Sequence, residues 1–361
     1  MGAAAVLTDR AGAALAAGAL AASPAAVVIA DHPRKALAYA AALWFGAQPE
    51  TMVAVTGTSG KTSVATFTRQ IWQALGLRAC SLGTMGVQGD YEAPLAHTTP
   101  EPITLHRVLA GMAAAGVTHA AMEASSHGLD QNRLDAVRIK AAAFTNFSQD
   151  HLDYHADFAE YFAAKALLFD RVLPEDGVAV INTDDARGAE MLAHARARGQ
   201  RVLTVGKAAD ATFRILAQRY DATGQDLRFA FDGAPQLVRL NLIGGFQAEN
   251  VLAAAGLAIG WLVDDRLVGD RQRGRHRRSA TSRAGTGIVE AGRAAHPGKD
   301  QAVALCHQPS DLDRLADWIN RCAETAHRAA HRVAGLVDLE GKSRTGPQPV
   351  EPVARHDQFQ F

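Results

Sequence analysis

The chain has 361 residues, a formal net charge of +0 at pH 7 and a hydrophobic content of 48%. This length accommodates about two or three domains, and the balanced charge gives no indication of a nucleic-acid-binding or membrane-binding protein. Cys80, Cys306 and Cys322 lack the spacing of a metal site or a disulfide framework, which fits a reducing cytoplasm. Neither a signal peptide nor a membrane span is evident, so we expect a cytoplasmic protein. We also expect a monomer.

Apolar runs alternate with helical patterns along the first 210 residues. Residues 25–30 form a short apolar run that we predict to be a buried strand, followed by a helix over 34–46. Further strands are expected at 51–55, 118–122, 141–145, 178–181 and 202–205. Helices are expected at 62–75, 101–115, 157–172 and 185–198. This alternation predicts an α/β fold with a mostly parallel sheet.

The pattern changes after residue 210. Residues 211–218, 226–231 and 237–242 predict three strands of a small antiparallel layer that flanks the main sheet. A strongly apolar helix is expected over 247–260. Residues 261–361 contain 14 Arg and 2 Lys and show no α/β alternation, so we expect an irregular tail, poorly ordered over 264–300 and with some helix at 309–333.

A glycine-rich loop, VTGTSGKTS, occupies residues 55–63 between an expected strand and an expected helix. Such a turn directs backbone N–H groups and the helix dipole at an anion. The familiar P-loop is G-x-x-x-x-G-K-[ST], and here Val55 replaces its first glycine. Lys61 would reach the terminal phosphates of a nucleotide, and the Thr62 hydroxyl would ligate Mg²⁺. The alternative is an ordinary glycine-rich turn.

Polar residues follow two other expected strands. Glu123 comes directly after the strand at 118–122, where a metal-binding carboxylate belongs, because ligands of parallel sheets bind at the carboxyl ends of strands. A dense polar cluster follows the strand at 141–145 and contains Asn146, Asp150, His151, Asp153 and His155. The cluster indicates a site, whereas Glu123 alone could also be a solvated glutamate.

Lys165 has apolar neighbours at helical spacing, among them Tyr161, Phe162 and Phe169. A lysine in such surroundings loses its proton more readily. The neutral amine could take up CO₂ and become a carbamate, which is an anionic ligand. The alternative is a lysine whose stem is buried while its ammonium reaches water.

Together these segments resemble the Mur ligase family, ATP-dependent enzymes that add amino acids to the peptidoglycan precursor. The loop has the family form TGTxGKT[TS], and the other markers are HTTP at 97–100, MEASSHGL at 122–129, QNR at 131–133, the run at 145–155 and AK at 164–165. Within the family the markers are most similar to members that add the third peptide residue, meso-diaminopimelate, to UDP-N-acetylmuramoyl-L-alanyl-D-glutamate. The resemblance covers roughly residues 1–260.

The resemblance implies roles for individual residues. Catalysis would involve Lys61, His151 and a carbamylated Lys165. ATP would be bound by Gly57, Thr58, Ser59, Gly60, Lys61, Thr62 and Ser63, with Asn250 contacting the base. Mg²⁺ would be held by Thr62, Glu123, His151 and Lys165. The UDP-muramoyl dipeptide would be bound by His97, Thr98, Thr99, Ser125, Gln131 and Arg133. The reaction would proceed through an acyl phosphate that the amine of the diamino acid captures.

The resemblance also implies a division of the chain. Residues 1–46 are expected to be the later part of an N-terminal UDP-substrate domain, and residues 47–260 the central ATP-binding domain. The family continues into a third domain with an Asp-Asn-Pro-Arg motif, which is absent from this sequence. A reading-frame change near residue 261 is our hypothesis for the change in composition there.

Other functions remain open at this point. A chain without the third domain would bind ATP and ligate little, so a non-catalytic ATP-binding fragment is an alternative, as is a lysine-adding ligase of the same family. Folylpolyglutamate synthetase shares the architecture and is disfavoured by the HTTP, SSHGLDQNR and DHLDYH segments. A nucleic-acid binder acting through RQRGRHRR at 271–278 is disfavoured because no aromatic residues are interleaved with the arginines.

Overall fold

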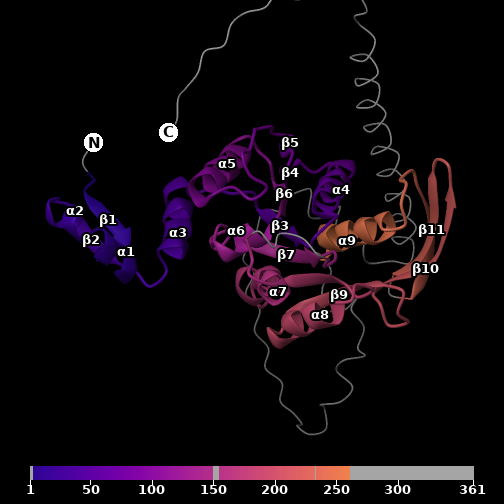
Figure 1. Cartoon of the computed structure of the whole chain (residues 1–361). Coiled ribbons are helices and arrows are strands. Elements are labelled where there is room, and N and C mark those ends of the chain that lie inside the picture. The colour runs from indigo at the N-terminus through magenta and orange to yellow at the C-terminus, as the bar shows by residue number, and fades with distance from the viewer. Residues whose placement is uncertain (1–2, 149–153, 232, 261–361) are drawn as a thin grey trace, which may run out of the picture.

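The computed structural model describes residues 3–148, 154–231 and 233–260, and the structural statements below concern these residues. Figure 1 shows a small N-terminal unit beside a larger α/β body. The predictions for residues 264–300 and 309–333, and those for Asp150, His151 and Asp153, fall outside the described residues. None of the helices within the described ranges is long and apolar enough to cross a bilayer.

The N-terminal unit contains a parallel pair of short strands, β1 (Ala5–Thr8) and β2 (Ala26–Ile29), with helices α1 (Arg10–Leu15) and α2 (Ala17–Ala21) between them. The prediction of a strand at 25–30 is confirmed, but the prediction that it is buried is wrong. Val27, Val28 and Ile29 are 42–47% exposed. The reason is that β2 pairs with β1 in a sheet of two strands, which within the described residues is too small to cover either face.

The body is built on one ten-stranded sheet with the order β12-β11-β10-β9-β8-β7-β3-β6-β4-β5. From β10 across the sheet to β4 each strand pairs in parallel with the next, whereas β5 is antiparallel to β4. The strands of the parallel part include β3 (Thr51–Thr56), β4 (Ala79–Gly83), β6 (His119–Glu123), β7 (Ile139–Phe144), β8 (Val178–Asn182) and β9 (Arg201–Gly206), and the antiparallel edge strand is β5 (Gly86–Gly89). The predicted α/β fold with a mostly parallel sheet is confirmed.

Helices cover both faces of this sheet (Figure 1). On one face α4 (Lys61–Ala74) packs against α9 (Gln247–Ile259), and Val53 and Val55 of β3 point into that core. On the other face lie α5 (Pro102–Ala114), α7 (Phe158–Leu167), the π-helical turn η1 (Leu168–Val172) and α8 (Gly188–Ala197). Met52 and Ala54 of β3 point into this second core. Helix α3 (Pro33–Phe45) joins the N-terminal unit to the body by packing against α5.

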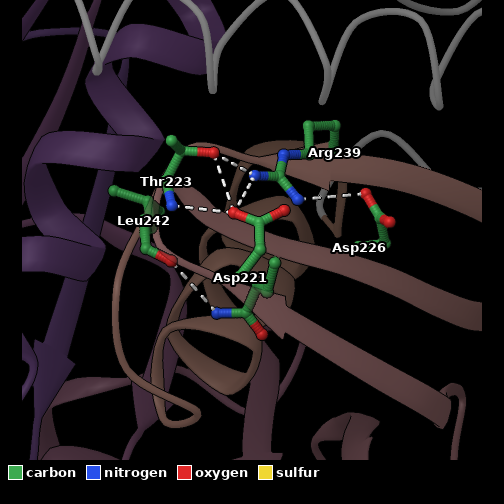
Figure 2. Close-up of polar contacts among 6 residues, drawn as sticks. Asp221, Thr223, Asp226, Arg239 and Leu242 are labelled. Carbon is green, nitrogen blue, oxygen red and sulfur yellow. Dashed lines mark hydrogen bonds and ion pairs between the residues drawn. The ribbon is translucent and has the colours of Figure 1, made fainter.

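Three antiparallel strands extend the sheet at one edge. They are β10 (Phe213–Asp221), β11 (Gly224–Phe231) and β12 (Ala234–Leu240). The extension joins the parallel part where β10 pairs in parallel with β9, so the predicted antiparallel layer is confirmed as a flank of the main sheet. At its β10–β11 turn, Arg239 bridges Asp221 and Asp226 with N···O distances of 2.7 and 3.3 Å (Figure 2).

The sequence patterns missed several short elements. Strands β1, β4 and β5 and helices α1, α2 and α6 (Ser126–Asp130) were not predicted. Strand β4 reads ACSLG, and its small residues carry little of the β-branched and aromatic pattern that marks a strand. Its omission matters for the site because the residue that follows it, Thr84, contacts the carboxylate of Glu123.

Candidate active site at the carboxyl edge of the sheet

The glycine-rich loop begins where β3 ends in the middle of the sheet. Gly57 has φ of +149° and Gly60 has φ of +86°, a region that favours glycine. A Cβ atom at Gly57 would lie 1.9 Å from Thr145 Oγ1, and one at Gly60 would lie 2.5 Å from Asn250 Oδ1. Both glycines are therefore needed for the chain to turn and for its neighbours to approach closely.

Residues after β7 fix the loop from one side. The Thr58 N–H donates to the Asn146 carbonyl at 2.9 Å, and the Ser59 N–H donates to Asn146 Oδ1 at 2.8 Å. Thr145 Oγ1 donates to the Ser59 carbonyl at 2.7 Å. The sequence analysis placed Asn146 in a polar cluster without this role, and it missed Thr145, because contacts across about 90 residues leave no local pattern.

Lys61 begins α4 and lies over the loop. Its Nζ donates to the carbonyls of Gly57 and Thr58 at 2.9 and 2.8 Å. The ammonium is thus held above the loop, at the N-terminus of α4, where helix geometry attracts anions. This is the position that the loop motif predicted for a phosphate-binding lysine.

Glu123 ends β6 and faces the start of α4. It is 2% exposed, and its Oε1 accepts hydrogen bonds from Thr62 Oγ1 at 2.9 Å and from the Thr84 N–H at 3.0 Å. Gly83 is also required here, because a Cβ atom at that position would lie 1.9 Å from Glu123 Oε1. The structure thus brings together Thr62 and Glu123, two of the four predicted metal ligands.

Lys165 approaches the same loop from α7. It is 0% exposed, its Nζ donates to the Gly57 carbonyl at 2.8 Å, and Nζ lies 4.3 Å from the centre of the Tyr161 ring. The predicted apolar surroundings are present, yet the amine also reaches the loop. Since a carbamate nitrogen keeps one N–H, this bond is compatible with both forms of the side chain.

The other side of the site is formed by Thr99, Ser125 and Arg133. Thr99 Oγ1 donates to the Glu123 carbonyl at 2.9 Å and accepts from the Ser125 N–H at 3.0 Å. Arg133 donates to the Thr99 carbonyl at 2.7 Å, and its guanidinium also donates to Gln131 Oε1 at 2.7 Å. Gln131 thus helps to position the guanidinium of Arg133 at the edge of the site.

These residues line a cavity of about 510 Å³, here called the first cavity. Its lining consists of Thr58, Gly60, Lys61, Thr62, Thr84, His97, Thr98, Thr99, Glu123, Ser125, Ser126, His127, Arg133 and Lys165. Most of the predicted loop, metal and substrate residues therefore meet in one space. Gly57 and Ser59 belong to the loop, Ser63 to the first turn of α4, and Gln131 is the C-cap of α6. Asn250 does not line this cavity. His151 lies outside the described residues.

A second cavity of about 310 Å³ lies on the other side of the loop. Its lining consists of Thr145, Asn146, Asn182, Asp184, Asp185, Lys207, Phe246, Glu249, Asn250 and Ala253. Asn250 is 3% exposed and touches Gly60, which lines the first cavity. Burial raises the pKa of Glu249, with a smaller opposing effect from Lys207. Apart from Asn146 and Asn250, no residue of this second cavity was predicted from the sequence to belong to a site.

The donors of the first cavity suit a magnesium ion. Carboxylate and hydroxyl oxygens such as those of Glu123 and Thr62 are the ligands that Mg²⁺ prefers. Among the described residues there is no group of three or more His, Cys, Asp or Glu side chains that could hold a metal. The arrangement therefore fits a hard cation shared with a phosphate ligand better than a metal enclosed by protein side chains.

Comparison with known proteins places this geometry in a family. Residues 55–258, more than half of the chain, match the model of the Mur ligase middle domain. The chain belongs to the Mur ligase family. The match spans the loop, Glu123, Lys165 and Asn250, and so includes both cavities.

Relatives with similar sequences carry one enzyme name. The chain is 51% identical over 233 residues to the UDP-N-acetylmuramoyl-L-alanyl-D-glutamate--2,6-diaminopimelate ligase of Bradyrhizobium diazoefficiens, covering 63% of this chain and 48% of that one. It is 44% identical over 291 residues to the ligase of the same name from Brucella melitensis, covering 79% and 57%. A share of 79% is more than residues 1–260 can supply, so this alignment includes part of 261–361. The chain spans about half the length of the curated relatives it matches.

Solved structures agree on the fold. A structure of UDP-N-acetylmuramoyl-L-alanyl-D-glutamate--2,6-diaminopimelate ligase superposes with a TM-score of 0.61 at 29% identity, covering 71% of this chain and 55% of that one. Folylpolyglutamate synthase from Mycobacterium tuberculosis, solved with ADP and AMPPCP, superposes with a TM-score of 0.53 at 22% identity, covering 65% and 61%. The second likeness extends to the fold alone.

Proposed function

We propose that this chain is the ATP-binding part of an amide ligase that joins meso-diaminopimelate to UDP-N-acetylmuramoyl-L-alanyl-D-glutamate in peptidoglycan synthesis. One observation carries the proposal. The first cavity brings the loop lysine, the Thr62–Glu123 pair and buried Lys165 together with Thr99, Ser125 and Arg133. A phosphate donor and a carboxylate acceptor could meet there. The enzyme name of the relatives at 44–51% identity supports the choice of substrates.

The reaction that we propose has two steps. A carboxylate oxygen of the D-glutamyl residue attacks the γ-phosphorus of ATP, the bond from that phosphorus to the bridging oxygen breaks, and ADP leaves. The amine nitrogen of diaminopimelate then bonds to the acyl carbon, phosphate leaves, and the nitrogen loses a proton to solvent. Both steps develop negative charge on phosphate oxygens, and groups fixed in advance stabilise such charge most effectively.

The residues of the first cavity would divide this work. Lys61 and the N–H groups of the loop would bind the β- and γ-phosphates. Mg²⁺, held by oxygens of Thr62 and Glu123, would neutralise phosphate charge. Arg133, fixed by Thr99 and Gln131, would bind an anionic group of the dipeptide substrate, with His97, Thr98 and Ser125 as neighbours. His151 stays a predicted catalytic residue and metal ligand.

We further propose that Lys165 acts as a carbamate. Its neutral amine would attack CO₂, form an N–C bond and release a proton, which places a negative charge beside the loop. Complete burial of the amine supports this, because desolvation favours the neutral form that reacts. The carbamate oxygens would then be further ligands for the cation.

The second cavity would hold the nucleoside end of ATP. It adjoins the loop through the contact between Asn250 and Gly60, and its amides, carboxylates and Phe246 suit a planar base with donors and acceptors on its edge. Residues 47–260 would form the ATP-binding domain and residues 1–46 part of the UDP-substrate domain. We also propose a monomer that works in the cytoplasm.

The test uses the purified chain with ATP, Mg²⁺, the UDP-dipeptide and either diaminopimelate or L-lysine. Mass spectrometry of the amide product and release of ADP are measured, and hydroxylamine is added in parallel to trap an acyl phosphate as a hydroxamate. We expect the hydroxamate with the full chain, and any amide product to contain diaminopimelate. ATP binding without hydroxamate or amide would leave only the non-catalytic fragment, and a lysine product would reverse the choice of amino acid.

A further inference from the structure

Two glutamine side chains of the antiparallel extension reach the loop that precedes α9. Gln225 of β11 is 0% exposed, and its Nε2 donates to the carbonyls of Gly244 at 2.9 Å and Leu242 at 3.5 Å. Gln218 of β10 donates from its Nε2 to Gln225 Oε1 and to the Gly245 carbonyl, both at 2.9 Å. The two amides thus form one hydrogen-bonded unit between the extension and the Gly244–Gly245 turn.

The carbonyls of Gly244 and Gly245 also accept hydrogen bonds from the first residues of helix α9. The Gly244 carbonyl accepts from the Gln247 N–H at 3.1 Å, and the Gly245 carbonyl accepts from the Ala248 N–H at 3.2 Å. Each carbonyl oxygen therefore uses one lone pair for the helix and the other for a glutamine. Gly244 has φ of +104°, a backbone conformation that favours glycine, and these bonds help to hold the turn in it.

The first turn of α9 contributes Phe246, Glu249 and Asn250 to the second cavity. A shift of the Gly244–Gly245 turn would move these three side chains together, since they follow within five residues. The phosphate side of the proposed ATP site is held by other residues, because the loop bonds to Thr145 and Asn146, and Thr62 bonds to Glu123. The glutamines are therefore linked directly to the base side of that site, and they reach its phosphate side through the contact of Asn250 with Gly60.

We propose that Gln218 and Gln225 are positioning residues that fix the nucleoside end of ATP through the first turn of α9. This rests on the proposed function, in which the second cavity holds that end. Chemistry supports a positioning role, since burying an amide in a sheet costs free energy that an apolar side chain of similar size would not. An amide pair with these hydrogen bonds instead specifies one conformation of the turn it holds.

The experiment compares two ligands that differ in the nucleoside alone. Calorimetry measures the Kd of ATP and of inorganic tripolyphosphate, with Mg²⁺, for the full chain and for Gln225→Leu. We expect the Kd of ATP to rise about tenfold, since Gln225 loses its hydrogen bonds to Gly244, Leu242 and Gln218. The Kd of tripolyphosphate should change by less than about twofold, because Thr145 and Asn146 hold the loop independently of the turn. A general loss of stability would change both constants alike.

A milder variant and a matched control complete the test. Gln218→Leu removes the bond to Gly245 and leaves Gln225 bonded to Gly244. This variant keeps the test available if Gln225→Leu fails to fold. We expect the Kd of ATP to rise about threefold and the Kd of tripolyphosphate to stay unchanged. Arg239→Gln alters the ion pairs with Asp221 and Asp226 at the same β10–β11 end of the strands (Figure 2), leaves both glutamine amides in place, and should change neither constant. Equal Kd values for ATP in the wild-type chain and in both glutamine variants would overturn the inference. A wild-type chain that binds no ATP would instead overturn the proposed function.

Discussion

The two cavities differ in the groups they contain, although residues of both contact the glycine-rich loop. The first is lined by hydroxyls together with Lys61, Arg133, Lys165 and one buried carboxylate. The second is lined by amides, carboxylates and an aromatic ring. Fixed charges suit phosphate and carboxylate chemistry, whereas amides suit recognition of a base. The difference predicts that changes in the first cavity slow the reaction, and that changes in the second weaken nucleotide binding.

The largest effect is expected for Lys61→Met. Removing a cation from the site of charge development should lower kcat by about 10³-fold or more, while the Kd of ATP rises much less because the loop N–H groups remain. ADP release in the presence of the UDP-dipeptide measures this. Lys207→Met, a lysine of the second cavity, is the matched control and should keep kcat within about threefold. Equal losses in the two variants would remove the distinction between the cavities.

A smaller loss is expected for Lys165→Gln, about 10²-fold in kcat, because the proposed carbamate would supply charge beside the loop. Carbon-13 NMR with labelled bicarbonate should give a carbamate signal for the wild-type chain and none for the variant. Lys140→Gln, which changes a lysine on β7, should retain the signal. A wild-type spectrum without a carbamate resonance would contradict the assignment, whatever the activity of the variant.

For Asn250→Ala we expect a rise in the KM of ATP of about tenfold with kcat nearly unchanged, since one or two hydrogen bonds to the base are lost. Steady-state kinetics at saturating UDP-dipeptide separates the two constants. The comparison of the cavities would fail if kcat fell and KM stayed constant.

The smallest effect concerns the antiparallel extension. A hydrogen bond from Arg239, with further bonds from Thr223, lowers the pKa of Asp221. This carboxylate therefore contributes stability above the unfolded pKa of about 3.9, and the contribution is lost as the pH falls through the lower folded pKa. Arg239→Gln should raise the pKa of Asp221 toward its ordinary value, which NMR titration of the carboxyl carbon measures. An unchanged pKa would show that Thr223 alone holds it.

The local part of the site was predictable from the sequence. The apolar run of β3, the glycines of the loop and the helical spacing after Lys61 are short-range patterns, and the structure has each element where it was expected. Glu123 was predictable as well, because the end of a parallel strand is a known place for a ligand. The helix that carries Lys165 was predicted from its apolar spacing and is confirmed as α7 followed by η1.

The remaining features depend on distant contacts. Asn146 and Thr145 fix the loop across about 90 residues, and Lys165 reaches Gly57 across 108. Glutamine is usually exposed to solvent. Gln225 is nevertheless fully buried, because its amide bonds to Gly244 and to Gln218. Similarly, β2 is an apolar run that is exposed. Burial depends on what covers a residue, and a local pattern does not contain that information.

The position of β3 in the middle of the sheet has a consequence for synthesis of the protein. Its neighbours β6 and β7 follow it by many residues, and the residue that meets Gly60 is Asn250. A ribosome adds residues from the N-terminus onward, so the loop emerges long before its walls do. A nascent chain halted before α9 would contain all of residues 55–63 and still lack the surface against which Gly60 is placed. The proposed nucleotide site is therefore among the last parts of the α/β body that can form.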